Sequence, residues 1–210
     1  MIDVIICDDH PIVRQGLARI IEEHLEVRSV READNGQMLI DLVRQQPGDV
    51  VLLDVGLPGR GGIDVLRQLK QERPKLPVLM LSIHPPDQYA VRALKAGASG
   101  YLTKDVATDE LIRALRAVTG GRRYVTSAVA EQLADDLDRP SGAALHDALS
   151  DREFEVLGLL GSGKSVSQIA DVLHLSYNTI STYRARILSK LGLKGDADII
   201  RYALKHGLAE

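Results

Sequence analysis

The chain has 210 residues, a length that fits one large domain or two small ones. Apolar residues make up 45% of it and charged residues 26%, which is typical of a folded chain and excludes a disordered one. The net charge of −3 argues against a protein that binds nucleic acid over its whole surface, although it leaves room for a local basic face.

The sequence has one cysteine, Cys7, so an internal disulfide framework and a zinc site built from several cysteines are excluded. The apolar runs are only a handful of residues long, and no apolar segment of the length found in signal peptides follows the amino terminus. We therefore expect neither a membrane span nor a secretory signal, and a cytoplasmic location.

Short β-branched runs alternate with amphipathic segments through about residue 121. The runs predict five strands, at residues 2–7, 27–33, 49–54, 77–82 and 100–104. The segments between and after them predict five helices, at residues 12–24, 37–46, 63–73, 88–96 and 109–118. Continuous apolar strands separated by helices predict an α/β fold with a parallel sheet covered on both faces. Gly120 and Gly121 are expected to end the last of these helices.

The strand pattern disappears after residue 121. A helix is expected at residues 125–137, inside a linker that spans residues 122–148. The chain from residue 149 to 210 reads as four short helices. Ser150 is expected to cap the first of them, with Glu153 completing a capping box.

Acidic, hydroxyl and basic side chains follow the predicted strands at one edge of the sheet. Asp8 and Asp9 follow the first strand, Asp54 ends the third, Ser82 ends the fourth and Lys104 ends the fifth. Ligands of parallel sheets bind at this edge. Any one of these acids alone could be a helix cap or a turn residue, but the combination favours a functional site.

Three carboxylates at one edge repel one another, and a divalent hard cation such as Mg²⁺ would offset that repulsion. A metal ion on one side of Asp54 and Lys104 on the other would together hold a tetrahedral, dianionic group. The pattern therefore predicts phosphoryl transfer to Asp54.

These residues resemble the receiver domain of bacterial two-component response regulators. The resemblance rests on the Asp8–Asp9 pair, on Asp54 within the run LLDVGLPGRGG, on Ser82, and on the run GYLTK that ends at Lys104. It covers residues 1–121. It implies a flavodoxin-like (CheY-like), doubly wound, five-stranded parallel sheet with Asp54 as the phosphoacceptor.

The same resemblance implies how the site holds its metal ion and the phosphate. Mg²⁺ would be bound by Asp9, Asp54 and the backbone carbonyl of Gly56, with Asp8 acting through a metal-bound water. Lys104 would pair with the phosphate.

The resemblance also implies a switch made of Ser82 and Tyr101. A new dianion on Asp54 would accept a hydrogen bond from Ser82, and the space that this hydroxyl leaves would let the Tyr101 ring turn inward. The alternative for Tyr101 is an amphipathic residue at the edge of the sheet.

Helices expected at residues 166–174 and 178–191, joined by a short turn, have the spacing of a helix-turn-helix. The apolar residues of the second helix are expected to face the core: Ile180, Ile187 and Leu191. Its opposite side carries small and hydroxyl residues suited to base edges: Asn178, Ser181, Thr182 and Ala185. Arg186 and Lys190 border that side, where phosphates would run, and Arg184 is a weaker candidate because it projects nearer the core.

Residues 149–210 carry 8 basic and 7 acidic side chains, so composition alone fits a generic helical bundle equally well. The motifs favour DNA binding. The run LSDREFEVL from Leu149, the run TIS from Thr179 and the run KLGL from Lys190 resemble the LuxR-type domain of the NarL/FixJ response regulators. This resemblance implies a small all-α domain of four helices that dimerises through its last helix and places residues 178–191 in the major groove.

The sequence departs from this family at Ser181 and Tyr183, where many members carry Lys and His. Fewer charges on the face that meets the bases would make binding depend more on dimerisation and phosphate contacts, with a steep response to salt.

Together the two resemblances predict a transcription factor and not an enzyme. A sensor histidine kinase would phosphorylate Asp54, and a homodimer would bind double-stranded promoter DNA, with RNA polymerase as a further candidate partner. One alternative is a Mg²⁺-dependent phosphohydrolase with an aspartyl-phosphate intermediate, but Gly56 stands where it would need a general acid. A second alternative is a constitutive DNA-binding regulator with a vestigial receiver.

Overall fold

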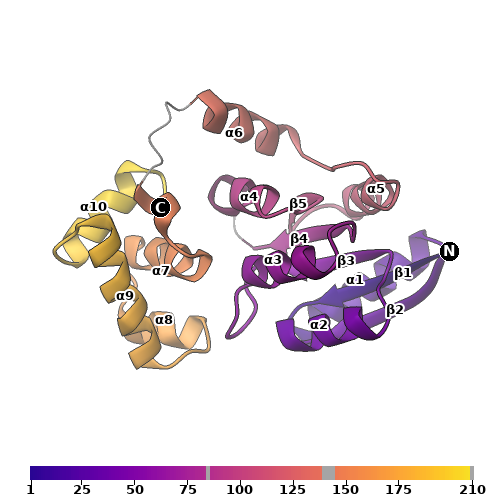
Figure 1. Cartoon of the computed structure of the whole chain (residues 1–210), viewed down its shortest axis with the longest axis horizontal. Helices are drawn as coiled ribbons and strands as arrows, with labels where there is room; N and C mark the ends of the chain where they lie inside the picture. The colour runs from indigo at the N-terminus through magenta and orange to yellow at the C-terminus, as the bar shows by residue number, and fades with distance from the viewer. Residues whose placement is uncertain (84–85, 139–144, 209–210) are drawn as a thin grey trace. The chain divides into compact units, whose positions relative to one another are not determined.

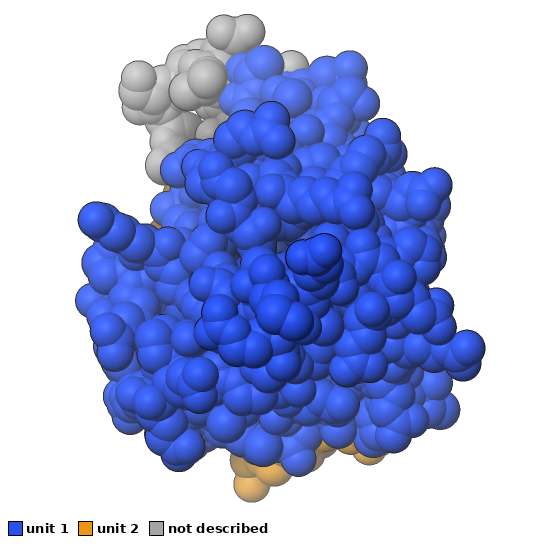
Figure 2. Space-filling view, turned by 90° about the vertical axis from the view of Figure 1, so that its right-hand side faces the viewer, with its two compact units in different colours: residues 1–138 blue, residues 139–210 orange. Residues whose placement is uncertain are grey.

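The computed structural model describes residues 1–83, 86–138 and 145–208 (Figure 1). The chain divides into two compact units, residues 1–138 and residues 139–210, which Figure 2 colours separately. Within the described ranges, none of the helices has both the length and the apolar character needed to cross a membrane.

The first unit is built on five parallel strands, in the spatial order β2-β1-β3-β4-β5. The strands are β1 (Ile2–Cys7), β2 (Val27–Ala33), β3 (Val50–Asp54), β4 (Val78–Ser82) and β5 (Gly100–Thr103). Every residue of β3 and β4 is buried, as expected for central strands covered on both faces. The predicted parallel sheet and its doubly wound fold class are confirmed.

Five helices cover the sheet: α1 (Pro11–His24), α2 (Gly36–Gln45), α3 (Gly62–Glu72), α4 (Pro86–Lys95) and α5 (Thr108–Thr119). Helices α1 and α5 pack together on one face, where Ile21 and Leu115 join Val4 and Leu52 in the hydrophobic core. Helices α2, α3 and α4 lie side by side on the other face (Figure 1).

Local sequence sets the ends of these helices. Pro11 occupies the first turn of α1, where its missing N–H costs nothing. The Asn35 side chain caps α2 by accepting a hydrogen bond from the Met38 backbone N–H at 2.9 Å. Helix α5 ends at Gly120, as predicted, and Gly121 follows with a φ of 77°, a conformation that favours glycine.

The chain after α5 returns along the edge of the sheet. Tyr124 pairs with Gly100 of β5 in a parallel bridge, and its backbone N–H donates to the Ser99 carbonyl at 2.9 Å. A Cβ at Gly100 would lie 2.6 Å from the Tyr124 carbonyl oxygen, so this approach needs a glycine. Helix α6 (Ser127–Asp138) follows and packs against α4 in the first unit. The predicted helix is therefore present.

The second unit is entirely helical in its described part. It contains the 3₁₀ turn η1 (Leu145–Ala148) and the helices α7 (Asp151–Gly161), α8 (Val166–Val172), α9 (Tyr177–Leu191) and α10 (Asp196–Lys205). The predicted capping box of Ser150 and Glu153 is confirmed at the start of α7. Gly192, with a φ of 66°, ends α9.

Candidate functional site

Four of the residues singled out in the sequence meet at the carboxyl edge of the sheet. Asp8 follows β1, Asp54 ends β3 and Lys104 follows β5. The Lys104 ammonium lies 2.6 Å from Asp8 Oδ2 and 2.9 Å from Asp54 Oδ2, so it bridges two buried carboxylates. The Lys104 backbone N–H donates to the Ser82 carbonyl at 2.7 Å, which fixes the lysine beside the end of β4.

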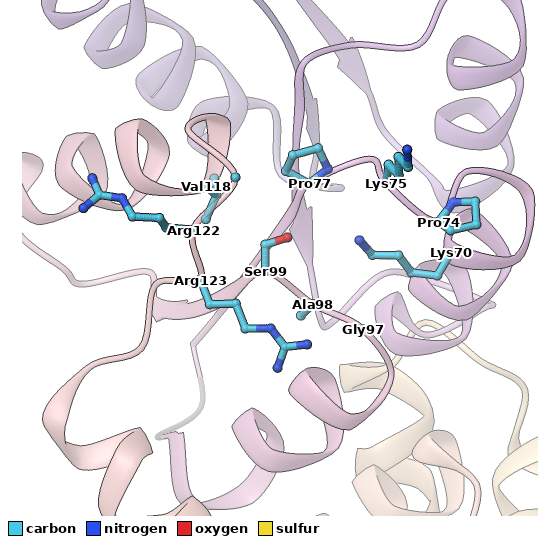
Figure 3. A pocket seen from close by; sticks show the side chains of 11 residues that line it. Lys70, Pro74, Lys75, Pro77, Gly97, Ala98, Ser99, Val118, Arg122 and Arg123 are labelled. Carbon is cyan, nitrogen blue, oxygen red and sulfur yellow. The ribbon is translucent and has the colours of Figure 1, made fainter.

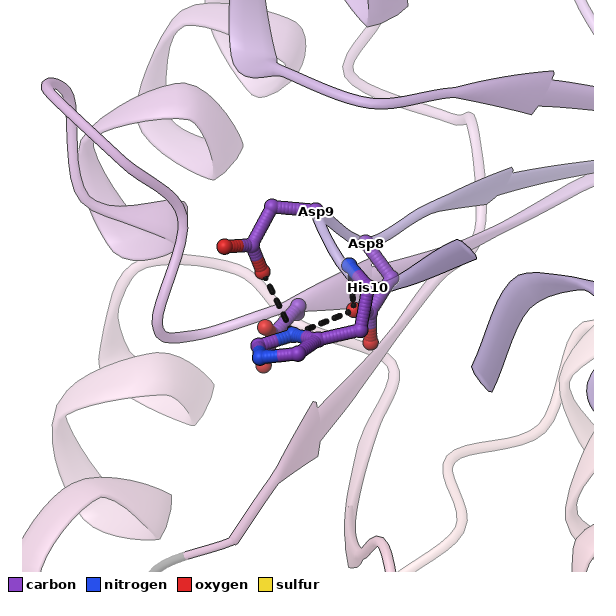
Figure 4. A group of neighbouring side chains, drawn as sticks. Asp8, Asp9 and His10 are labelled. Carbon is purple, nitrogen blue, oxygen red and sulfur yellow. Dashed lines mark hydrogen bonds and ion pairs between the residues drawn. The ribbon is translucent and has the colours of Figure 1, made fainter. Parts of the chain in front are cut away.

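Asp9 extends the cluster towards the surface, together with His10 (Figure 4). The His10 Nδ1 atom lies 2.8 Å from Asp9 Oδ1 and 3.2 Å from Asp8 Oδ1. The His10 backbone N–H also donates to Asp8 Oδ1 at 2.8 Å. The sequence gives His10 no evident role, because no metal-ligand spacing connects it to another histidine.

Arg14 is a residue of this neighbourhood that sequence reasoning missed. Its guanidinium donates to the Asp8 backbone carbonyl at 2.6 Å and also pairs with Glu32 at 3.0 Å. It stands one helical turn after His10, on α1, but nothing in the amphipathic pattern of α1 separates it from an ordinary surface arginine.

The carboxylates form a set suited to a metal ion. Ligand atoms of Asp8, Asp9, His10 and Asp54 lie within 4.8 Å of one another. Two carboxylates at that separation repel by about 3 kcal/mol at an effective dielectric constant of about 20. Asp9 Oδ1 is buried, and among the described residues its close polar neighbour is the His10 ring, at 2.8 Å. Hard oxygen donors with a surplus of negative charge fit Mg²⁺.

The electrostatics of Asp54 and Lys104 are coupled. Burial raises the pKa of Asp54, and the neighbouring Asp8 charge raises it further, while Lys104 and the Gly56 N–H counteract part of that rise. Burial of Lys104 works against its charged form, but Asp54 and Asp8 outweigh it and raise the pKa of Lys104. The lysine therefore stays protonated and the aspartate is held in an unfavourable environment for its charge.

The loop after β3 is held tightly under Asp54. The Gly56 backbone N–H hydrogen-bonds to the Asp54 carboxylate, and the Gly62 N–H donates to the Val55 carbonyl at 2.9 Å. A Cβ at Gly62 would lie 1.9 Å from the Asp54 carbonyl oxygen, far closer than a non-bonded carbon can approach. The loop that returns to α3 therefore passes directly over the backbone of the acidic residue.

Ser82 and Tyr101 lie on neighbouring strands. Ser82 ends β4 and is buried, and Tyr101 lies on β5 opposite Met80 of β4. The Tyr101 side chain is only 1% exposed, so its ring is turned inward in this structure. Helix α4 packs on β5, and α6 packs on α4.

The second unit presents a candidate nucleic-acid interface on α9. Ile180, Ile187 and Leu191 are buried, which confirms the predicted core face of this helix. The predicted base-facing residues lie at least partly in solvent: Asn178, Ser181, Thr182 and Ala185. The Thr182 hydroxyl donates to the Asn178 carbonyl at 2.8 Å, so this hydrogen bond fixes its rotamer.

The three cations predicted on α9 have different surroundings. Arg186 is exposed, whereas Arg184 Nε pairs with Asp196 at the start of α10, at 2.6 Å. The Lys190 ammonium lies 2.6 Å from Glu153 of α7, whose side chain is 3% exposed. Among the described residues, only Arg186 of these three has no ionic partner.

The two segments of the chain that carry these sites each match a known protein family. Residues 4–116 match the response regulator receiver domain, and residues 147–203 match the bacterial regulatory proteins of the luxR family. The chain therefore belongs to the two-component response regulators of the NarL/FixJ family, in which a receiver domain is joined to a LuxR-type DNA-binding domain.

Similar proteins match over nearly the full length of the chain. The response regulator UvrY of Escherichia coli is 34% identical over 99% of this chain and 96% of its own length. The response regulator GacA of Pseudomonas aeruginosa is 35% identical over 100% of this chain and 99% of its own. A solved structure of RcsB from Salmonella enterica serovar Typhimurium, bound to the rprA promoter with the phosphomimetic BeF₃⁻, is 27% identical, with a TM-score of 0.60 over 96% of this chain and 98% of that one.

Proposed function

We propose that Asp54 is the phosphoacceptor of this response regulator and that a sensor histidine kinase is the donor. The observation that carries the proposal is the placement of the Lys104 ammonium between Asp54 and Asp8, at 2.9 Å and 2.6 Å. When the phosphoryl group moves to a carboxylate oxygen of Asp54, a P–O bond forms as the bond to the donor breaks. Lys104 then has a dianion as its partner in place of a single carboxylate charge.

Asp9, Asp54 and the backbone carbonyl of Gly56 would hold Mg²⁺, with Asp8 acting through a bound water. When bound, the ion supplies positive charge against the oxygens of the transferring phosphoryl group. Asp8 keeps Lys104 in position through their ion pair, and Gly56 also orients the Asp54 carboxylate through its N–H. His10 shields Asp9 from one side.

Ser82 and Tyr101 would change position in response to a phosphate on Asp54. The Ser82 hydroxyl would donate to a phosphate oxygen, and the inward position of Tyr101 would then be favoured over an outward one. Helix α4 packs on β5, and α6 packs on α4. A change in the position of the Tyr101 ring would therefore alter the packing of α4 and, through it, of α6, the last helix of the first unit.

The second unit would read promoter DNA with α9. Asn178, Ser181, Thr182 and Ala185 would face base edges, and Arg186 would contact a phosphate. Arg184 and Lys190 would reach phosphates only after leaving Asp196 and Glu153. A homodimer is proposed as the binding species, and one solved RcsB structure is described as two dimers bound to two parallel DNAs.

The experiment is to measure DNA binding and oligomeric state of the full chain with Mg²⁺, with and without beryllofluoride. Beryllofluoride is expected to strengthen both dimerisation and DNA binding, and Asp54→Asn is expected to remove the response. Asp41→Asn, at a half-exposed aspartate on α2 away from the acidic cluster, is the matched control and should respond as the unaltered chain does. A chain whose DNA binding and association both ignore beryllofluoride would contradict the proposal and favour a constitutive regulator.

A further inference from the structure

A second polar site lies at the opposite edge of the same sheet. A cavity of about 400 Å³ opens at the amino ends of β4 and β5 (Figure 3), whereas Asp54 and Lys104 lie at the carboxyl ends of their strands. Its walls come from α3, from the loops before β4 and β5, and from the end of α5 with the segment after it; their polar side chains are Lys70, Lys75, Ser99, Arg122 and Arg123.

The charge of this cavity is entirely positive. Four of the lining residues are cations and none is an acid. Within the described residues, no carboxylate pairs with Lys70, Lys75, Arg122 or Arg123. The unit that contains the cavity, residues 1–138, carries 21 acidic and 17 basic side chains, so four cations without a carboxylate partner around one cavity indicate an anionic ligand.

Lys70 is held at the cavity rather than extended into solvent. Its ammonium donates to the Leu76 carbonyl at 2.6 Å, and its stem lies under Gly97, where a Cβ would approach the Lys70 Cγ to 3.1 Å. Gly97 has a φ of 103°, which a side chain rarely permits. Burial lowers the pKa of Lys70, and the nearby positive charge of Arg123 lowers it further. A bound anion would favour the charged form of Lys70 and so offset both effects.

Ser99 supplies a hydrogen-bond donor in the wall of the cavity. Its Oγ accepts a hydrogen bond from the Val78 N–H at 3.3 Å, which leaves the hydroxyl proton free to donate. In Figure 3 the Ser99 hydroxyl and the Lys70 ammonium point towards one another, while Arg122 extends away from them.

We propose that this cavity binds a small molecule that carries two or more linked phosphate groups, with Lys70, Arg123 and Ser99 on the phosphate oxygens. The volume falls in the range of small-molecule sites, and a concave cavity suits a compact polyanion better than a nucleic-acid duplex. Pro74 and Pro77 offer an apolar surface beside the cations. Because Arg123 directly precedes Tyr124, which pairs with Gly100 of β5, a bound ligand would also stabilise the segment that leads to α6.

The test is calorimetric titration of the full chain with inorganic tripolyphosphate, in EDTA and about 150 mM salt, where long-range attraction is screened. EDTA removes divalent ions that could hold the probe at the carboxyl edge. We expect saturable binding to one site, and orthophosphate should bind at least about tenfold more weakly because it reaches fewer cations.

Three variants locate the binding. Arg123→Gln alone and the pair Lys70→Gln with Arg123→Gln remove cations of the cavity, and each removal is expected to weaken binding by about tenfold. Arg19→Gln removes one exposed cation of α1, which pairs with Glu23, and should leave the affinity unchanged. Amide shifts of the unaltered chain on titration should appear at residues 97–99 and 121–124.

Each remaining outcome overturns the proposal. These outcomes are no binding at this salt concentration, equal affinity for orthophosphate, equal losses in Arg19→Gln and Arg123→Gln, and amide shifts confined to residues 178–191. Arg123 is exposed and makes no hydrogen bond among the described residues, so its variant is expected to fold and keeps the test decisive.

Discussion

The carboxyl edge of the sheet and helix α7 both bury carboxylates, but they surround them differently. At the sheet edge, Asp8, Asp9 and Asp54 lie close together, and Lys104 pairs with Asp8 and Asp54 but not with Asp9 among the described residues. On α7, Glu153 pairs with Lys190 and caps its own helix, and Glu155 contacts Arg152.

The difference separates a site built for chemistry from contacts that stabilise a fold. A carboxylate with its own cation and backbone donors contributes to the free energy of unfolding. A buried carboxylate that lacks its own cation lowers the free energy of unfolding until a metal ion binds beside it. Neutralising a carboxylate should therefore raise the free energy of unfolding at the sheet edge and lower it on α7.

The largest effect is expected from the backbone beneath the acidic site. Gly62→Ala should lower the free energy of unfolding of the first unit by about 3 kcal/mol or more, because the new Cβ meets the Asp54 carbonyl at 1.9 Å. Gly61→Ala, one residue earlier, has no atom within 4 Å of its Cβ and should change stability by less than about 0.5 kcal/mol. Chemical denaturation of both variants measures this contrast, and equal midpoints would show that the loop is not held as described.

Glu153→Gln should destabilise the second unit by about 2 kcal/mol, because it removes the Lys190 ion pair and weakens the capping box. Asp171→Asn, at an exposed position on α8, is the control and should be nearly neutral. Thermal unfolding of the second unit gives the comparison. If the Glu153→Gln variant were as stable as the unaltered chain, the Glu153–Lys190 ion pair would contribute nothing to the free energy of unfolding.

The same pair makes the second unit sensitive to acid. Burial opposes the charge of Glu153, but Lys190 and the Ser150 backbone N–H prevail and lower the pKa of its carboxyl group. A lowered folded-state pKa gives stability that is present above the ordinary glutamate pKa and is lost as the pH falls through the lowered value. The stability difference between the unaltered chain and Glu153→Gln should therefore shrink on acidification, and a difference that grows would contradict this sign.

Asp9→Asn should act in the opposite direction. In EDTA it relieves repulsion from Asp8 and Asp54 and is expected to stabilise the first unit by about 1 kcal/mol. Added Mg²⁺ should stabilise the unaltered chain and leave the variant nearly unchanged, because a ligand of the ion is missing. Melting curves with EDTA and with Mg²⁺ test both statements. If Asp9→Asn lowered the melting temperature in EDTA, the prediction would be wrong, and Asp9 would stabilise the fold as Glu153 does.

The smallest effect is expected on α9. Arg186→Gln should weaken promoter binding by about threefold at moderate salt. It should also reduce the slope of the logarithm of the binding constant against the logarithm of the salt concentration by the contribution of about one phosphate contact. Arg184→Gln should have a smaller effect, because Arg184 is held by Asp196. Binding isotherms at several salt concentrations give both slopes, and a larger loss for Arg184 would reverse the roles assigned to these two cations.

The parts predicted well from the sequence are those that depend on local spacing. Apolar runs define β3 and β4, the Ser150 capping box starts α7, and Ile180 and Ile187 face inward on α9 as their helical spacing requires. The meeting of Asp54 with Lys104 was predictable as well, because the carboxyl ends of parallel strands share an edge.

Contacts that depend on three-dimensional packing could not be predicted in this way. Lys190 meets Glu153 only because α7 packs against α9, and sequence reasoning treated that lysine as free for DNA. The basic cavity is similar, since Lys70, Ser99 and Arg123 lie on segments far apart in the chain. No spacing rule connects such residues, so their arrangement becomes visible only in the fold.

The most direct test of the account is phosphoryl labelling of the purified chain with Mg²⁺ and a small phosphodonor. We expect about one base-labile label per chain, carried as an acyl phosphate on residue 54 and absent from Asp54→Asn and from samples in EDTA. Asp41→Asn should label normally. A label that persists in Asp54→Asn would contradict the account, and many turnovers of the donor per chain would favour a phosphohydrolase instead.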